Sequence, residues 1–261
     1  MTASTLDVAD VTLRYRLDGP AGAPVLVLSN SLGTTLSMWD LQVPALSRTF
    51  RVLRYDTRGH GESSNGKEPC TIERLGRDVV GLLDGLGIDR AHFCGLSMGG
   101  VIGMWLGIHA PQRFLRLALC NTAAKIGTEE RWAARIAAVR GGGMAAIVDT
   151  VMGVWFTPGF TARDPAAVAK IRMQLERTSP EGYVAACTAI RDMDLRGEIG
   201  AIKLPTLVIA GAHDASTPPG DGRFVAERIS GSRLVELDAA HLSNIEAAPQ
   251  FTSAVAGFFE A

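Results

Sequence analysis

A serine lies in a short glycine-rich turn between a segment of strand length and a segment with a helical pattern. The turn, residues 95–99, reads GLSMG; an apolar run at 91–94 precedes it and a helical pattern at 98–109 follows. In a strand–turn–helix context, G-x-S-x-G places the serine on a sharp, strained turn at a helix N-terminus, where the helix dipole favours a developing negative charge. Gly95 and Gly99 leave room for close backbone approach. The pattern predicts that Ser97 is a nucleophile held above a sheet.

Short apolar runs alternate with helical patterns along most of the chain. Runs of strand length cover residues 11–16, 25–28, 51–55, 91–94, 115–120, 206–210 and 234–237, and helical patterns cover 72–86, 98–109 and 251–259. Apolar runs of this size are typical of strands buried on both faces, as in a parallel sheet; the first run alternates and is expected to be an exposed strand. The alternation predicts an α/β fold with a doubly wound, mostly parallel sheet.

The alternation is interrupted once, from about residue 123 to residue 196. This stretch shows no good strand and four helical patterns, at 129–140, 144–155, 165–177 and 180–193. The simplest interpretation is a helical cap, residues 123–196, inserted into an α/β core formed by residues 1–122 and 197–261. A cap of this kind covers a pocket and shapes its specificity.

The composition excludes several classes of protein. With 261 residues, 47% of them hydrophobic, the chain can bury the core of one large domain. The 26 Lys and Arg residues nearly balance the 27 Asp and Glu residues, and the net charge of −1 gives no general attraction to nucleic acid or to an anionic membrane. We therefore expect no nucleic-acid partner and no membrane partner.

The N-terminal sequence and the cysteines predict a location. The chain shows no signal-peptide pattern and no apolar run near the roughly 18 residues of a membrane span. Its four cysteines form no CxxC pair. We expect a soluble, cytoplasmic protein with reduced core thiols. The sequence does not indicate an oligomeric state.

A serine nucleophile needs an acid and a base, which follow it in the order Ser, Asp or Glu, His in proteins with this turn. Asp214 comes just after the run 206–210, at the carboxyl end of a predicted strand, where α/β sheets place their sites. His241 follows the last predicted strand. His213 precedes the acid in the chain, so it does not fit the order. We predict a Ser97–Asp214–His241 triad.

Two main-chain amides are expected to form the oxyanion hole. One is that of Met98, the residue after the nucleophile. The other is that of Leu32, in the loop that follows the strand at 25–28. Residues 56–63 form a second polar turn, which we interpret as structural, with His60 as part of the scaffold. No cluster has metal-ligand spacing and no phosphate-binding glycine motif is present, so we expect no metal and no cofactor.

These motifs resemble the α/β-hydrolase superfamily over nearly the whole chain. A closer resemblance is to the 3-oxoadipate enol-lactonases of the bacterial β-ketoadipate pathway. It is carried by residues 29–34, 55–61, 93–100, 121–127, 155–158, 181–183 and 189–192. The resemblance implies hydrolysis of an enol-lactone through an acyl-enzyme, without a cofactor. One departure is Asn30-Ser31, where most relatives of this design carry His-Gly. The donor is main chain, so only the local hydrogen bonds of the loop are in question.

The implied substrate is a small anionic lactone, whose carboxylate needs a cation, ideally arginine. The candidates that the cap offers are Lys125, Arg131, Arg135 and Arg140. Arg131 and Arg135 are four apart and share one helix face, and Trp132 can supply an apolar wall. We predict that Arg131 and Trp132 line the pocket, although a solvated basic face with Trp132 in the core is equally consistent with the pattern.

Two alternatives remain open at the level of sequence. The same triad serves carboxylesterases, carbon–carbon bond hydrolases and perhydrolases. A ligand-binding receptor can also keep the hydrolase fold and signal through its cap. Dependence of activity on the cap arginines would distinguish an enol-lactonase from these other enzymes. Sustained turnover would distinguish an enzyme from a receptor.

Overall fold

Eight strands form a single sheet in the computed structural model, which describes residues 4–261. They are β1 (Ser4–Val8), β2 (Val11–Asp18), β3 (Val25–Ser29), β4 (Arg51–Tyr55), β5 (Ala91–Leu96), β6 (Phe114–Cys120), β7 (Thr206–Gly211) and β8 (Arg233–Leu237). Their order is β1-β2-β4-β3-β5-β6-β7-β8. The pairs β1–β2 and β2–β4 are antiparallel and the other pairs are parallel. The predicted α/β fold class is confirmed.

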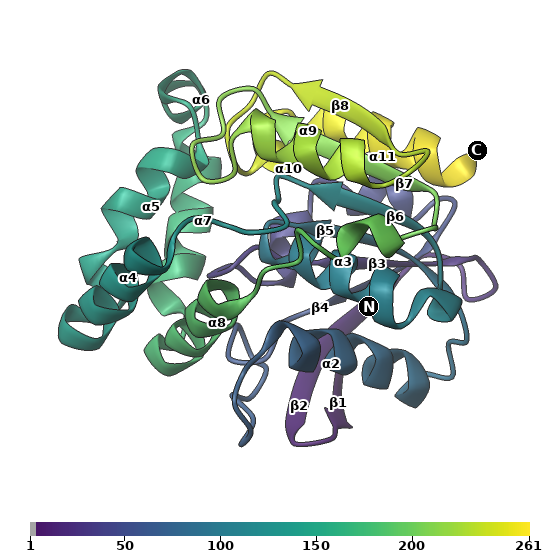
Figure 1. Cartoon of the computed structure of the whole chain (residues 1–261), viewed down its shortest axis with the longest axis horizontal. Helices are drawn as coiled ribbons and strands as arrows, with labels where there is room; N and C mark the ends of the chain where they lie inside the picture. Colours follow the sequence, from purple (N-terminus) through teal and green to yellow (C-terminus); the bar gives the residue numbers. More distant parts are fainter. Residues whose placement is uncertain (1–3) are drawn as a thin grey trace.

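Helices cover both faces of the sheet (Figure 1). They are η1 (Leu36–Trp39), α1 (Val43–Leu46), α2 (Ile72–Gly85), α3 (Met98–His109), η2 (Pro111–Arg113), η4 (Ile199–Ala201), α9 (Pro219–Arg228), α10 (Ser243–Glu246) and α11 (Ala248–Glu260). α2 packs on α3, which contacts β5 and β6, and both α1 and α10 pack on α11. Helix α9 was not predicted because its first turn contains proline and two glycines.

The N-terminal strands differ from the sequence prediction. β1 was missed because the strand has only five residues and most of them are polar. It pairs with β2 from Ser4–Tyr15 to Val8–Val11. Because β4 pairs with the other edge of β2, β2 lies inside the sheet, and its side chains are buried or half-buried. The expectation of an exposed strand at residues 11–16 is therefore wrong.

A group of helices without strands joins β6 to β7. It consists of α4 (Glu129–Gly142), η3 (Met144–Ala146), α5 (Val148–Trp155), α6 (Pro158–Arg163), α7 (Pro165–Arg177) and α8 (Pro180–Asp192). These helices lie to the left of the sheet in Figure 1, and α4 packs on α8 while α5 packs on α7. The helix predicted at 144–155 is divided by Ile147, and α6, only one and a half turns long, was not predicted.

Local capping explains where these helices begin. The side chains of Thr128, Thr157, Asp164 and Ser179 each accept a hydrogen bond from an amide of the first turn of α4, α6, α7 and α8. Proline occupies the first position of three of these helices, where its missing N–H has no cost. The helix boundaries are therefore encoded locally, whereas the face that each helix turns toward the site is not.

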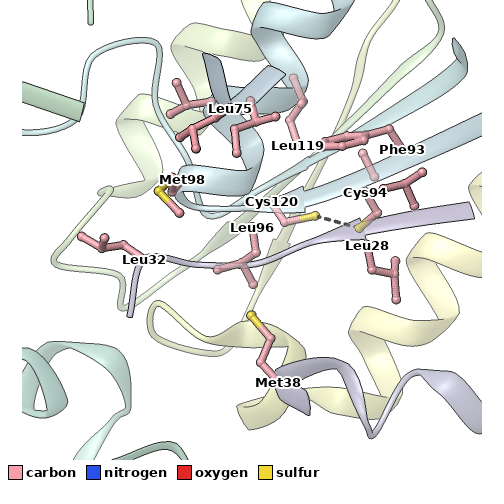
Figure 2. Close-up of a cluster of buried hydrophobic side chains, with 14 of the residues drawn as sticks. Leu28, Leu32, Met38, Leu75, Phe93, Cys94, Leu96, Met98, Leu119 and Cys120 are labelled. Carbon is pink, nitrogen blue, oxygen red and sulfur yellow. Dashed lines mark hydrogen bonds between the residues drawn. The ribbon is translucent and has the colours of Figure 1, made fainter. Parts of the chain in front are cut away.

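Of the two strands that support the Ser97 turn, β5 is completely buried, and β6 is buried over its last four residues, 117–120. Figure 2 shows the apolar side chains around β5 and β6, including Phe93, Leu96 and Leu119. The sulfurs of Cys94 and Cys120 lie 3.9 Å apart between these two strands. Such close packing leaves the segment before Ser97 little freedom to move.

Within residues 4–261, the helices are too short or too polar to span a bilayer.

Candidate active site

Ser97 occupies a strained position between β5 and α3. Its backbone angles are φ 58° and ψ −114°, in a region that residues with a side chain rarely adopt. A Cβ at Gly95 would lie 2.1 Å from the Gly99 carbonyl oxygen, and one at Gly99 would lie 2.2 Å from that of Ser29. Both glycines are therefore required by contact with other backbone segments. The strain is maintained by the Ser97 amide, which donates to the Cys120 carbonyl at 2.9 Å.

Asp214 and His241 form a buried pair. The Nδ1 atom of His241 lies 2.8 Å from Oδ2 of Asp214, and both side chains are almost inaccessible. Asp214 follows β7 and also accepts hydrogen bonds from the amides of Ser216 (2.8 Å) and Thr217 (3.0 Å) and from the Thr217 hydroxyl (2.8 Å). Burial raises the pKa of Asp214, but His241, the Thr217 amide and the Asn121 carboxamide outweigh burial and lower the pKa below its usual value. The ionised carboxylate keeps the proton of neutral His241 on Nδ1.

The two amides predicted for an oxyanion hole are unused. Leu32 follows β3 and Met98 is the first residue of α3; among residues 4–261 neither N–H has a main-chain acceptor.

The Asn30 side chain, where most relatives of this design carry histidine, makes its own local hydrogen bonds. Its Nδ2 donates to the Tyr55 carbonyl at 2.8 Å, and Trp39 Nε1 donates to its Oδ1 at 2.9 Å. Asn30 thus anchors the loop to the sheet.

A small enclosed cavity joins these groups. Its volume is about 30 Å³, which is room for about two water molecules. It is lined by Ser31, Leu32, Ser97, Ile126, Arg131, Trp132, Arg135, Trp155, Tyr183, Ile190, Ser216 and His241. The structure therefore brings Ser97, His241 and Leu32 to one cavity, and Asp214 is hydrogen-bonded to His241.

The turn at 56–63 does not contribute to this cavity. The Asp56 carboxylate accepts a hydrogen bond from the Leu36 amide at 2.7 Å, and Arg58 pairs with Asp78 at 2.6 Å. Burial lowers the pKa of His60, which is inaccessible. These contacts agree with a scaffold role. Within residues 4–261 no group of three or more His, Cys, Asp or Glu side chains is arranged to hold a metal ion.

Comparison with known proteins agrees with the geometry. A family model described as alpha/beta hydrolase fold matches residues 24–143. The chain is 47% identical to 3-oxoadipate enol-lactonase 2 of Acinetobacter baylyi, over 96% of this chain and 94% of that protein. It is also 51% identical to the enol-lactonase of Burkholderia xenovorans LB400, whose crystal structure superimposes with a TM-score of 0.97 over 99% of this chain and 100% of that one. The chain belongs to the 3-oxoadipate enol-lactonase family. It therefore shares the α/β-hydrolase fold of that family.

The cap gives this family member two arginines on the cavity wall. Arg131 and Arg135 come from one face of α4, and the Arg135 guanidinium lies 5.1 Å from the centre of the Trp132 ring. Trp132 is itself held by a hydrogen bond from Nε1 to the Ile126 carbonyl at 2.6 Å. Among the ion pairs of residues 4–261, none involves either arginine. Burial and the neighbouring Arg135 lower the pKa of Arg131.

The other two basic candidates do not line the cavity. The Lys125 Nζ atom donates to the carbonyls of Arg191 and Met193 at 2.7 and 2.8 Å, so it holds the end of α8. Arg140 lines a separate outer cleft. Arg135 was only one of four candidates in the sequence, and Tyr183 was not predicted as a site residue. The buried Tyr183 hydroxyl has no hydrogen-bond partner among the described residues. No local sequence signal distinguishes a cavity tyrosine from a core tyrosine.

Proposed function

We propose that this chain hydrolyses 3-oxoadipate enol-lactone to 3-oxoadipate, a step of the β-ketoadipate pathway. The observation that carries the proposal is the pairing of two features around one cavity. A serine, histidine and aspartate lie at the carboxyl ends of the strands, and two arginines without ion pairs face them from α4. The high identity to enol-lactonases over the whole chain supports the same assignment. We also propose a cytoplasmic location, where four unpaired cysteines stay reduced.

The first half of the reaction would form an acyl-enzyme. Ser97 Oγ attacks the lactone carbonyl while His241 takes its proton as general base. The oxyanion receives hydrogen bonds from the amides of Leu32 and Met98. Cleavage of the ring C–O bond releases the enol oxygen, which takes the proton from His241, and the enol ketonises to the 3-oxo group. Asp214 holds the imidazole and stabilises its charged form.

The second half would release the product. A water molecule gives its proton to His241 and attacks the acyl carbon of the ester on Ser97. The same two amides stabilise the second tetrahedral intermediate. Its collapse breaks the bond to Ser97 Oγ, which recovers its proton from His241. The net reaction consumes one water and leaves a second carboxylate on the product.

Arg131 and Arg135 would bind the carboxylate that the lactone already carries. An arginine can bind a carboxylate through two parallel hydrogen bonds, and neither guanidinium has an acidic partner to release first. Trp132 holds Arg135 by stacking, so the guanidinium is oriented before the ligand arrives. Tyr183 offers a further hydroxyl donor on the same wall. Together these residues favour an anionic substrate over a neutral ester.

The test is hydrolysis of 3-oxoadipate enol-lactone, followed by loss of its ultraviolet absorbance, with phenyl acetate as a neutral comparison. Wild-type protein should turn over the enol-lactone rapidly, and Ser97→Ala should lower kcat by about 10⁶-fold on both substrates. Phenyl acetate hydrolysis with an inert enol-lactone would reject the proposed substrate while keeping the triad.

The cap arginines are tested by Arg131→Gln and Arg135→Gln. Each should lower kcat/KM for the enol-lactone by about 10- to 100-fold, because a charge-assisted hydrogen bond is lost. Phenyl acetate hydrolysis should stay within about twofold. Arg140→Gln, on the same helix but outside the cavity, is the matched control and should leave both substrates unaffected. Equal losses on the two substrates would contradict carboxylate binding by these residues.

A further inference from the structure

We propose that Asn121 is a positioning residue for the acid and the base: its carboxamide ties Asp214 to the backbone segment that carries His241. Asn121 follows β6 directly and is buried (1% exposed). The inference rests on the proposed function only in that Asp214 and His241 are taken as the working acid and base. It concerns a side chain that does not line the cavity.

The backbone of Asn121 is unusual. Its φ is 44°, and within residues 4–261 only Ala9 and Ser97 are other non-glycine residues with positive φ. Its amide donates to the Ile209 carbonyl at 2.7 Å, which holds the end of β6 against β7. Asparagine tolerates this conformation better than most residues do, but glycine adopts it without strain. The backbone alone therefore does not account for a carboxamide at this position.

The contacts of the side chain explain why an asparagine occupies this position. Nδ2 donates to Asp214 Oδ2 and to the Ala240 carbonyl, both at 3.1 Å. Oδ1 accepts a hydrogen bond from the Ser243 hydroxyl at 2.5 Å. Each polar atom of the carboxamide is thus paired: the Asp214 carboxylate and the Ala240 carbonyl, which only accept, determine where Nδ2 lies, and the Ser243 hydroxyl holds Oδ1. The two donor contacts reach the acid itself and the residue immediately before the base.

A second observation is that the backbone segments around this amide are packed tightly at Gly211. A Cβ at Gly211, the last residue of β7, would lie 2.9 Å from Asn121 Nδ2 and even closer to the Ala239 and Ala240 carbonyls. Only glycine leaves space there for the carboxamide to reach both loops. Main-chain bonds such as His213 N–H to the Ala239 carbonyl at 3.0 Å also join the loops, but they do not touch the carboxylate.

The electrostatic effect of the amide has a defined sign. The Asn121 donor is one of the groups that lower the pKa of Asp214, against the effect of burial. The titratable or charged groups that face Asp214 are His241, Arg131 and Asp221. Loss of the Asn121 donor leaves the carboxylate a stronger acceptor for the Nδ1 proton of the imidazole. The protonated form of the base is then favoured, so the acid limb of the kcat/KM profile moves to higher pH.

Asn121→Gly tests the proposal, because it keeps the positive φ without strain and removes only the carboxamide. We expect kcat to fall by about 10- to 100-fold on both the enol-lactone and phenyl acetate, with KM within about twofold. The acid limb should move to higher pH. Ala9→Gly relieves the same kind of backbone strain far from the site; it is the matched control and should change neither kcat nor the pH profile.

Ser243→Ala provides a second, milder test. It removes the hydroxyl that holds Oδ1 of the amide, so kcat should fall by about two- to tenfold and the acid limb should move in the same direction. If Asn121→Gly does not fold, this variant decides the question. Wild-type kcat and an unchanged pH profile in either folded variant would overturn the proposal. Since phenyl acetate reports the same dyad, an inert enol-lactone would reject the proposed substrate without affecting this test.

Discussion

The loops that carry the acid and base and the cap wall opposite them are built in contrasting ways. Asp214 receives hydrogen bonds from Ser216, Thr217, Asn121 and His241, and almost none of it is exposed. The cavity wall formed by α4 presents Arg131 and Arg135, which have no ion pair among residues 4–261, and Arg135 lies over the Trp132 ring. The contrast teaches that the part proposed to perform the chemistry has its polar groups paired internally, whereas the part proposed to face the substrate keeps its charges available. Under this proposal the first would serve any acyl substrate and the second would select among them.

The largest loss of activity is expected for Asp214→Asn, which tests whether the acid serves both substrates equally. The substitution keeps the shape of the side chain but presents a donor to His241 Nδ1, so the imidazole is held in the wrong tautomer. A loss of about 10⁴-fold in kcat is expected, by the same factor for the enol-lactone and phenyl acetate. Steady-state kinetics on both substrates checks this. A loss confined to the anionic substrate would mean that Asp214 takes part in recognition, which would break the comparison.

The double variant Arg131→Gln/Arg135→Gln tests the opposite wall. It should lower kcat/KM for the enol-lactone by about 10² to 10³-fold while phenyl acetate hydrolysis is nearly unchanged. If the two arginines share one carboxylate, the combined loss will be smaller than the product of the single losses. Comparison of the four proteins in a double-mutant cycle measures this coupling. Full additivity would instead indicate two independent contacts.

The two regions meet at Glu246, where a smaller effect is expected. Its carboxylate accepts hydrogen bonds from the Ala240 amide (2.9 Å), from the Thr157 amide (3.3 Å) and from the Thr157 hydroxyl. Thr157→Val removes the hydroxyl bond and should lower kcat by about two- to tenfold on both substrates, because the residue preceding His241 is held less firmly. Thr157→Ser should restore the rate. Equal kcat values for all three proteins would show that the cap does not influence the base through this contact.

The buried His92 is expected to make the stability of the protein depend on pH, and its substitution should leave the catalytic rate unchanged. Burial, with a smaller effect of Arg116, lowers the pKa of His92 to about 4. Between this value and about 6.5, the unfolded chain binds a proton that the native state does not. Stability therefore falls as the pH decreases through that window. His92→Phe, between Phe50 and Phe259, should make Tm less dependent on pH from 7.5 to 5. An identical pH dependence of Tm in both proteins would contradict this.

Much of the fold and the central part of the site could be predicted because their signals are local. The turn at Ser97, the apolar strands and the capped starts of α7 and α8 are each encoded by neighbouring residues. Asp214 and His241 followed from their order and from the ends of predicted strands. β1 and α9 were missed because one is short and polar and the other begins with turn residues.

The remaining site residues depend on contacts between distant parts of the chain. Asn121 lies 93 residues before its partner Asp214 and 119 before Ala240. Glu246 contacts Thr157, which is 89 residues away. Arg131 and Arg135 share a helix face, but the packing of α4 on α8 decides that both line the cavity. A single sequence carries no local signal for any of these arrangements.

The connection between β6 and β7 has a consequence for how such a protein can diversify. The residues of α4 to α8 form one uninterrupted stretch of chain, while the groups proposed for the chemistry lie before and after it. Exchange of a single gene segment would therefore replace Arg131 and Arg135 and leave the proposed nucleophile, acid and base unchanged. An incoming segment keeps the contact with Glu246 only if it supplies a hydroxyl and an amide there. Segments that do so would preserve the link to the backbone next to His241 while the substrate that they admit is free to change.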